Sequence, residues 1–163
     1  MIYVTVGTQL QFDRLISAVD HWAARAKRGD VCAQIGKSSY VPQAISWVRF
    51  LTPDQSIERV RAADVIVSHA GMGTIIEALE SGTPIIIFPR LAALGEQRND
   101  HQLSTARRFG ERGLVKVAED ETALNRILDG LNESKPGGCL KPFASAELTG
   151  FLAEFLGKPC VGG

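Results

Sequence analysis

Short apolar runs alternate along the chain with segments in which apolar residues recur every three or four positions. The short runs are rich in β-branched residues and bounded by glycine or polar residues, so they predict strands over residues 2–6, 31–35, 45–50, 65–67, 85–88 and 114–117. The periodic segments predict helices over 12–27, from 54 to about 63, from about 72 to 80, over 100–110 and over 122–131. Gly82 is expected to close the helix that ends near residue 80.

The predicted strands are uniformly apolar and alternate with helices, a pattern typical of a parallel sheet buried on both faces. The fold class is therefore predicted to be α/β, a single Rossmann-like domain with helices on both faces of a parallel sheet. Residues 1–163 are expected to form one domain, with a body over 1–131, a loop over 132–144 and a final helix over 145–156. The tail places apolar side chains on one helical face, which packs on this domain or on a partner: Phe143, Leu148, Phe151, Leu152, Phe155 and Leu156.

Composition and charge narrow the function classes. The chain is 45% hydrophobic and 22% charged with a formal net charge of zero, so no long-range field favours nucleic acid. Three cysteines without paired spacing predict free thiols and no metal site. The start of the chain resembles a first strand and not a signal peptide. The longest apolar run, Pro84 to Pro89, is far shorter than the ~20 residues that cross a bilayer.

The segment around His69 carries the most informative chemistry. A buried strand ends at Ser68 and His69, and Gly71 and Gly73 follow immediately before a helix. The first amides of a helix lack partners within the helix and lie at the positive end of its dipole. Because the glycines let a bulky anion approach the backbone, this turn predicts a phosphate-binding site.

Glu77 lies about one turn into the same helix, too far from its start to cap it. Its carboxylate can reach the vicinal hydroxyls of a ribose attached to the bound phosphates, although a solvated helix residue is the other interpretation. A dinucleotide fingerprint is disfavoured, because Ile76 stands where the third glycine belongs and no acidic residue follows the next strand.

These residues carry a family resemblance. His69, Gly71, Gly73, Thr74 and Glu77, followed by Gly82-Thr83-Pro84 and Pro89, resemble the donor-site signature of GT-B glycosyltransferases, in particular the family 28 C-terminal domains. The start of the chain, with Val4-Thr-Val-Gly-Thr8 and Phe12-Asp13, is similar to the small one-domain members. These members include bacterial exopolysaccharide subunits of the PssE type and the catalytic subunit of the dolichol-pathway UDP-GlcNAc transferase. Residues 95–102 also resemble the PssE-type segment.

The resemblance implies individual roles at the site. The backbone of Gly71, Met72, Gly73 and Thr74 is expected to hold the diphosphate of a UDP-sugar, with His69 facing it and Glu77 binding ribose. His69 could instead be a core histidine bonded to backbone. Gly7 and Thr8 end the first strand at the same sheet edge, where such proteins place the phosphates or the acceptor, although a structural turn is equally consistent with Thr8.

A second group of residues is expected to contact the donor sugar. His101 and Gln102 fall where plant enzymes of this type carry an acidic residue and a glutamine, and Asn99 and Asp100 are neighbours that can share the task. Asn99 and Asp100 could equally cap the next helix. Glu96-Gln97 is a competing placement of the same acid–glutamine pair.

The resemblance implies a two-component glycosyltransferase that moves a sugar from UDP to a lipid-diphosphate-linked saccharide in exopolysaccharide or glycan assembly. His101 and Asp13 are weak candidates for the general base, so a membrane-anchored acceptor-binding subunit of the PssD type is expected to complete the site. That partner would recruit the cytoplasmic chain to the inner face of the membrane. No cofactor is expected and the chemistry is predicted to be metal-independent. A non-catalytic nucleotide-sugar-binding module and a UDP-sugar epimerase are the alternatives.

Overall fold

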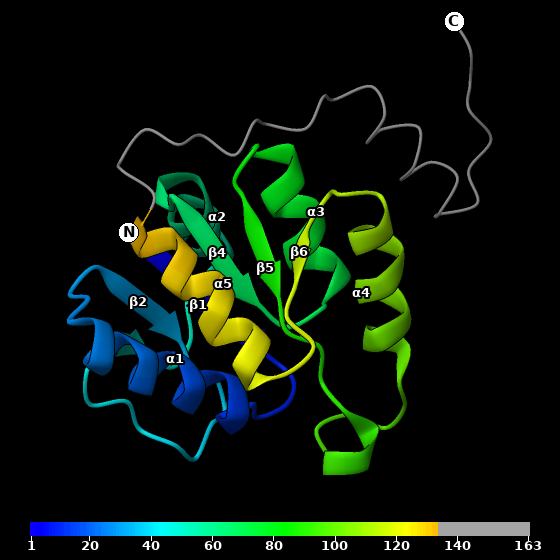
Figure 1. Cartoon of the computed structure of the whole chain (residues 1–163), viewed down its shortest axis with the longest axis horizontal. Helices are drawn as coiled ribbons and strands as arrows, with labels where there is room; N and C mark the ends of the chain where they lie inside the picture. Colours follow the sequence, from blue (N-terminus) through cyan, green and yellow to red (C-terminus); the bar gives the residue numbers. More distant parts are fainter. Residues whose placement is uncertain (134–163) are drawn as a thin grey trace, which may run out of the picture.

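The computed structural model describes residues 1–133, so the helix predicted over 145–156 and most of the predicted loop lie outside the described residues. Six parallel strands form one sheet in the order β3-β2-β1-β4-β5-β6 (Figure 1). Their bounds are β1 Ile2–Thr5, β2 Val31–Gln34, β3 Ser46–Val48, β4 Val65–Ser68, β5 Ile85–Ile87 and β6 Lys116–Val117. The predicted α/β class with a parallel sheet is confirmed, and the order is that of a Rossmann fold.

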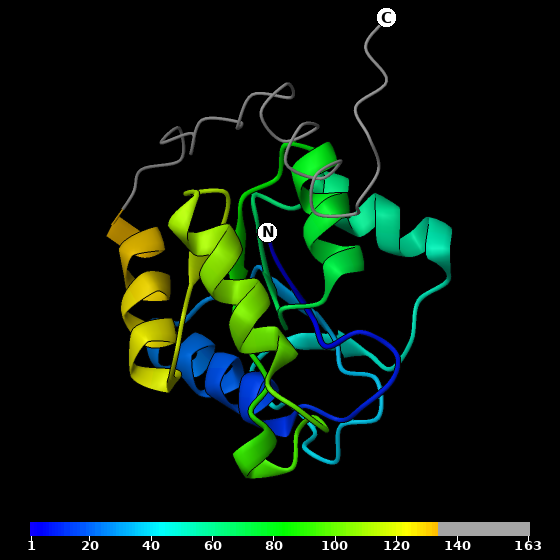
Figure 2. The same ribbon diagram turned by 90° about the vertical axis from the view of Figure 1, so that its right-hand side faces the viewer.

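Helices cover both faces of the sheet. They are α1 Asp13–Ala26, α2 Pro53–Ala62, α3 Met72–Glu80, α4 His101–Glu111 and α5 Glu121–Glu133. Figure 2 shows α1 and α5 on one side of the sheet and α2 and α3 on the other. Strand residues alternate between the two cores, so Ile2 and Val4 face α1 and α5 while Tyr3 faces the side of α2, α3 and α4.

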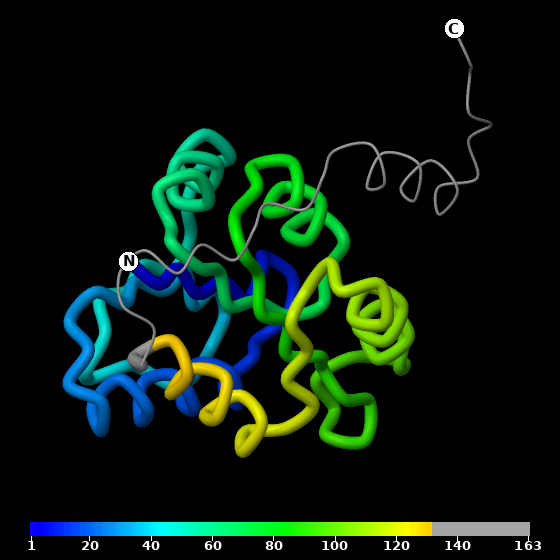
Figure 3. The backbone as a smooth tube through the Cα atoms, turned by 45° about the horizontal axis from the view of Figure 1, so that its top comes forward, coloured from blue at the N-terminus to red at the C-terminus, as the bar shows by residue number. Residues whose placement is uncertain are grey.

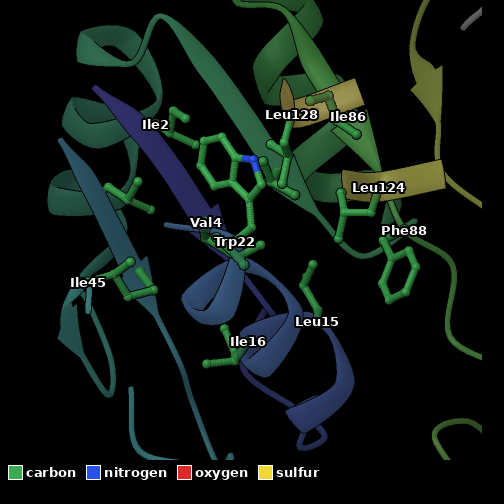
Figure 4. Close-up of a cluster of buried hydrophobic side chains, with 14 of the residues drawn as sticks. Ile2, Val4, Leu15, Ile16, Trp22, Ile45, Ile86, Phe88, Leu124 and Leu128 are labelled. Carbon is green, nitrogen blue, oxygen red and sulfur yellow. The ribbon is translucent and has the colours of Figure 1, made fainter. Parts of the chain in front are cut away.

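Trp22 fills the centre of the core beneath α1 and α5. Its side chain is fully buried between the sheet and residues such as Leu124 and Leu128 of α5 (Figure 4). The indole Nε1 donates a hydrogen bond of 2.8 Å to Asp129 Oδ1, so the one polar atom of the ring is satisfied at the helix surface. α1 and α5 consequently lie side by side (Figure 3).

Local sequence signals explain where α2 begins and where α3 ends. Thr52 and Gln55 form a reciprocal capping box at the start of α2, with Pro53 in the first turn. Ser81 is the C-cap of α3, and Gly82 follows it with a φ of 68°. The glycine therefore ends the helix one position beyond the cap, since a left-handed residue there carries no Cβ penalty.

Three details differ from the sequence predictions. β3 is short and every one of its residues is exposed, because it is an edge strand that pairs only with β2. A 3-10 helix, η1 Ala92–Leu94, lies in the connection after β5, where no element was predicted. α5 continues to Glu133, so residues 132 and 133 of the predicted loop are helical.

Candidate functional site

A cleft of about 700 Å³ opens at the carboxyl ends of β1, β2 and β4. The chain turns in opposite directions after β1 and after β4, which are neighbours in the sheet, so the cleft lies at the switch point where open α/β sheets bind ligands. The cleft is lined by Thr5, Val6, Gly7, Thr8, Gln9, Leu10, Gln34, Leu51, Thr52, Pro53, Ser56, His69, Gly71, Gly73, Thr74, Glu77, Arg90, Gln97 and Gln102.

The N-terminus of α3 faces this cleft. Gly71 is the N-cap, and no side chain caps the first amides of the helix. These amides and the positive end of the helix dipole are therefore available to an anion. Gly73 and Thr74 line the cleft, as predicted from the sequence, whereas Met72 does not line it.

The two glycines of this turn do different things. A Cβ on Gly71 would lie 2.2 Å from His69 Nε2, so the absence of a side chain makes room for the imidazole. A Cβ on Gly73 would meet nothing within 4 Å, so this glycine leaves space in the cleft itself. A Cβ on Gly7, whose φ is 72°, would lie 2.8 Å from His69 Cε1, so this glycine also makes room for the ring. The imidazole thus lies in a slot between two loops.

His69 is held in its neutral form within this slot. Burial, and to a smaller extent the nearby Arg90 charge, lowers the pKa of its imidazole to about 4, while a hydrogen bond with the Thr5 backbone opposes this shift. Ser68 Oγ lies 3.3 Å from Nδ1. A neutral ring that contacts two glycine loops supports them sterically, and at neutral pH it brings no positive charge to an anion.

Glu77 lines the cleft one turn into α3, where the sequence placed it. Burial raises the pKa of its carboxyl group, and Glu80 adds to this while Arg61 opposes it. Thr52 and Ser56 of α2 line the same cleft. Carboxylate and hydroxyl oxygens from two helices can together accept and donate hydrogen bonds to the hydroxyls of a sugar ring.

Arg90, which follows β5, is a cleft residue that the sequence reasoning missed. It is only 2% exposed, and its guanidinium donates to the backbone carbonyls of Val6 and Leu10, each at 2.9 Å, and to that of Gln11. Burial lowers its pKa to about 10, which leaves it charged at neutral pH. An arginine immediately after a buried apolar strand was the only available signal.

Gln102 lines the cleft, but its side-chain oxygen already accepts two hydrogen bonds from the backbone. Oε1 accepts hydrogen bonds from the amides of Ala70, at 3.2 Å, and Arg90, at 3.0 Å. The side chain therefore joins the turn after β4 to the segment after β5. Only its amide nitrogen is left for the sugar contact that the sequence predicted.

The other predicted sugar-binding residues do not line the cleft. Asn99, Asp100 and His101 are all exposed on the segment that leads into α4. Asn99 Oδ1 accepts from the amide of His101 at 3.4 Å, while Asp100 Oδ1 accepts from that of Ala92 at 3.2 Å. Asp100 is the N-cap of α4, although its side chain makes no capping bond.

Glu96 and Gln97, the competing acid–glutamine pair, have different surroundings. The carboxylate of Glu96 accepts two hydrogen bonds from Arg14, at 2.7 and 2.8 Å, and one from the amide of Leu91 at 2.9 Å. Gln97 lines the cleft. Of this pair, therefore, the glutamine is placed to meet a ligand.

Asp13, a weak candidate for the general base, lies outside the cleft lining. Its Oδ1 accepts hydrogen bonds from the amides of Ser39, at 2.8 Å, and Tyr40, at 3.2 Å. This carboxylate therefore fixes the connection between β2 and β3 to the start of α1.

Residues 1–133 contain no group of three or more histidine, cysteine or acidic side chains that could hold a metal ion. Over the same residues, no helix has the length and apolar character needed to cross a bilayer.

Comparisons with known proteins place this chain in a family. The family model for the glycosyltransferase family 28 C-terminal domain matches residues 1–147. The UDP-N-acetylglucosamine transferase subunit ALG13 of Homo sapiens is 32% identical in an alignment of 122 residues that covers 69% of this chain but only 10% of that protein.

Two solved structures share the fold. The solution structure of ALG13 superimposes with a TM-score of 0.60 at 23% identity, over 94% of this chain and 93% of that one. MurG of Acinetobacter baumannii gives a TM-score of 0.58 at 18% identity, over 80% of this chain and 40% of that one. Since the family model spans nearly all of the sequence, the chain belongs to the glycosyltransferase family 28 C-terminal domain.

Proposed function

We propose that this chain is the donor-binding subunit of a two-component glycosyltransferase. It binds a UDP-sugar in the cleft at the switch point, and a separate membrane-anchored subunit of the PssD type brings a lipid-diphosphate-linked saccharide. In the reaction, the bond between the sugar anomeric carbon and the phosphate oxygen breaks. A new bond to an acceptor hydroxyl forms, its proton passes to a general base, and UDP leaves.

One observation carries the proposal: the uncapped start of α3 opens into the cleft beside Gly73, and Glu77 follows on the same helix. A diphosphate fits the amides and the dipole of that helix. Glu77 is then one turn further along, where a ribose attached to the phosphates would lie. The buried, charged Arg90 adds positive potential to the same cleft.

The relatives support a UDP-sugar as the donor and a subunit as the role. ALG13 is by name a subunit of a UDP-N-acetylglucosamine transferase, and a transferase of Natranaerobius thermophilus that uses the same sugar is 35% identical over 63 residues. This chain spans about a tenth of that ALG13 and 16% of the second protein. UDP-GlcNAc is thus the first donor to test, before UDP-glucose, UDP-glucuronate and UDP-galactose.

The partner is proposed to supply the acceptor side. Neither of the two candidate bases, Asp13 and His101, lines the cleft, and Asp13 already accepts two backbone hydrogen bonds. The general base is therefore assigned to the partner, which would also hold this chain at the inner face of the membrane. The charge on departing UDP is proposed to be stabilised by the α3 amides and by Arg90, without a metal ion.

Calorimetry with UDP, uridine and pyrophosphate tests the binding site. UDP is expected to bind, and Gly73→Ala is expected to weaken UDP at least about tenfold, because its Cβ occupies the space of the diphosphate. The same variant should fold normally and even gain up to about 1 kcal/mol, since alanine favours a helix more than glycine does. Folded wild-type protein that takes up no UDP would end the proposal.

A transfer assay separates the enzyme from a non-catalytic nucleotide-sugar-binding module. The chain is combined with a candidate membrane subunit, a lipid-linked acceptor and each UDP-sugar, with and without a metal chelator. Product is expected only when both subunits are present, and the chelator should leave it unchanged. Binding of UDP-sugar with no transfer by any pairing would favour the binding module instead.

A further inference from the structure

We propose that Arg90 is the positioning residue of the donor site. It sets the shape of the loop after β1, and it supplies the fixed positive charge beneath the cleft that favours a diphosphate. This inference rests on the proposed function, and it adds a residue that the donor-site motif does not contain.

The first argument is the set of bonds that the guanidinium makes. Its two terminal nitrogens donate to the carbonyls of Val6, Leu10 and Gln11, and at 3.4 Å to that of Glu96. Three of these carbonyls belong to the connection between β1 and α1. Because these bonds span six residues of one connection, the arginine fixes the path of the segment that contains Gly7 and Thr8.

The second argument is the packing around the same group. The guanidinium carbon lies 4.5 Å from the centre of the Phe12 ring, and Phe12 stacks on Phe88 at 5.7 Å between ring centres. Phe12 precedes α1, while Phe88 directly follows β5. The arginine is therefore locked in place by the aromatic core beneath it, and the geometry it imposes on the loop is rigid.

The third argument is charge. Within the described part of the chain, no carboxylate forms an ion pair with Arg90. Glu96 is the nearest candidate, but its carboxylate is held by Arg14 and the amide of Leu91. The Glu96 charge raises the pKa of Arg90 without forming an ion pair with it, and the groups that bond the guanidinium are carbonyls. This buried cation therefore keeps a positive charge that a diphosphate in the adjoining cleft would neutralise.

The fourth argument is that Arg90 connects the loops of the site. Its backbone amide shares Gln102 Oε1 with the amide of Ala70, in the turn after β4. His69 of that turn contacts Gly7, in the loop that the guanidinium holds. The loops after β1, β4 and β5 therefore form one unit, and since His69 is neutral, the charge of that unit is carried by Arg90.

Two substitutions separate the charge from the bonding pattern. Arg90→Met removes both, whereas Arg90→Lys keeps the charge but cannot reach all four carbonyls. Arg98→Met is the matched control, because it removes an exposed arginine from the same connection between β5 and α4. Each folded variant is titrated with UDP, uridine and pyrophosphate by calorimetry at two salt concentrations, and His69 is titrated by NMR.

For Arg90→Met, the affinities for UDP and pyrophosphate should fall roughly tenfold or more, because a partly screened charge pair is lost. The affinity for uridine should change much less. The imidazole of His69 should titrate at higher pH than in the wild type. Arg90→Lys should keep the ratio of UDP to uridine affinity and a low His69 pKa, with weaker binding of both ligands. Arg98→Met should match the wild type.

The inference fails if Arg90→Met retains the wild-type ratio of UDP to uridine affinity. It fails equally if Arg98→Met lowers that ratio as much as Arg90→Met does. If Arg90→Met does not fold, Arg90→Lys decides, and a ratio that collapses despite the retained charge overturns the assignment. Wild-type protein that binds no UDP would instead refute the proposed function, so the two failures are distinguishable.

Discussion

We call the loops after β1 and β4, together with Arg90 beneath them, the floor of the cleft. From the sequence, these loops and the segment that leads into α4 were assigned to the same ligand, but the structure holds the two regions in different ways. In the floor, His69 lies against Gly7 and Gly71, and Arg90 is almost fully buried. In the segment before α4, Asn99 and His101 are exposed and bond only locally, through a single contact between them. The floor is fixed by the core, whereas the other region is held by exposed side chains that bond nearby backbone amides.

The comparison indicates which residues of the site have positions fixed by the central strands of the sheet. The floor loops begin at β1 and β4, which are hydrogen-bonded neighbours at the centre of the sheet. The segment before α4 follows β5 through η1 and a connection that is exposed at residues 93–95 and 98–100. Residues that must meet a diphosphate at a defined distance are therefore expected in the floor, while the outer segment is free to differ in its sugar contacts.

The largest effect is expected from Gly71→Ala. Its Cβ would lie 2.2 Å from His69 Nε2, so the imidazole must leave its slot or the backbone must move. Overpacking of this kind costs about 1–3 kcal/mol, and we expect a loss near the upper end, measured by urea unfolding. UDP affinity should fall as well, because the first turn of α3 shifts.

The double variant His69→Ala/Gly71→Ala is the control for this steric explanation. Removing the imidazole makes room for the new methyl group, so the double variant should be more stable than the sum of the two single effects predicts. Strict additivity in the cycle would show that the slot does not exist as described. Gly73→Ala, from the same turn, should not destabilise the protein.

A second, smaller effect is a dependence of stability on pH that originates at His69. The folded pKa of about 4 lies below the ordinary value of 6.5, so the folded protein resists protonation that the unfolded chain accepts. The stabilisation is complete above pH 6.5 and is lost as the pH falls from 6.5 towards 4. We expect a decrease of about 2–3 kcal/mol over that interval.

Urea unfolding at several pH values measures this decrease. His69→Gln cannot titrate, so its stability should change less between pH 6.5 and 4 than that of the wild type. His101→Gln removes an exposed histidine and should keep the wild-type slope. An identical slope in all three proteins would contradict a buried neutral imidazole in the floor.

The smallest effects are expected in the outer segment. Asn99→Ala and His101→Ala should change the free energy of unfolding by no more than about 0.5 kcal/mol, as is usual for exposed positions. UDP affinity should change less than about threefold in calorimetry. If these variants bind a UDP-sugar more weakly but bind UDP as before, this segment reaches the sugar in the complex. The two regions would then differ in the part of the ligand they bind, the floor the phosphates and the outer segment the sugar.

Much of the fold was predictable because the signals are local. Buried parallel strands give continuous apolar runs, and the pair Gly71 and Gly73 before a helix marks the turn after β4. β3 was predicted to be buried like the other strands. Its residues have strand propensity in either case, so the local sequence does not show whether another element covers them. That it is an exposed edge depends on the order of strands in the sheet, which no local pattern contains.

The site was predictable only in part, for a similar reason. Gly7, Thr8, His69 and Glu77 line the cleft where their motif positions placed them. Arg90 was not found, since its bonds reach back about eighty residues to the loop after β1. The dual use of Gln102 was also hidden, because whether its amide faces a ligand or the backbone depends on how α4 approaches β5.

Arg90 and His69 brace the floor of the cleft through hydrogen bonds and contacts within the chain itself. We therefore expect the conformation that binds a nucleotide to be populated before binding. The observed affinity should then be close to the intrinsic affinity of that conformation. Association should accordingly follow a single kinetic phase whose rate rises linearly with ligand concentration. If a partner subunit supplies the acceptor, as proposed above, a slow isomerisation is expected only when that subunit is present.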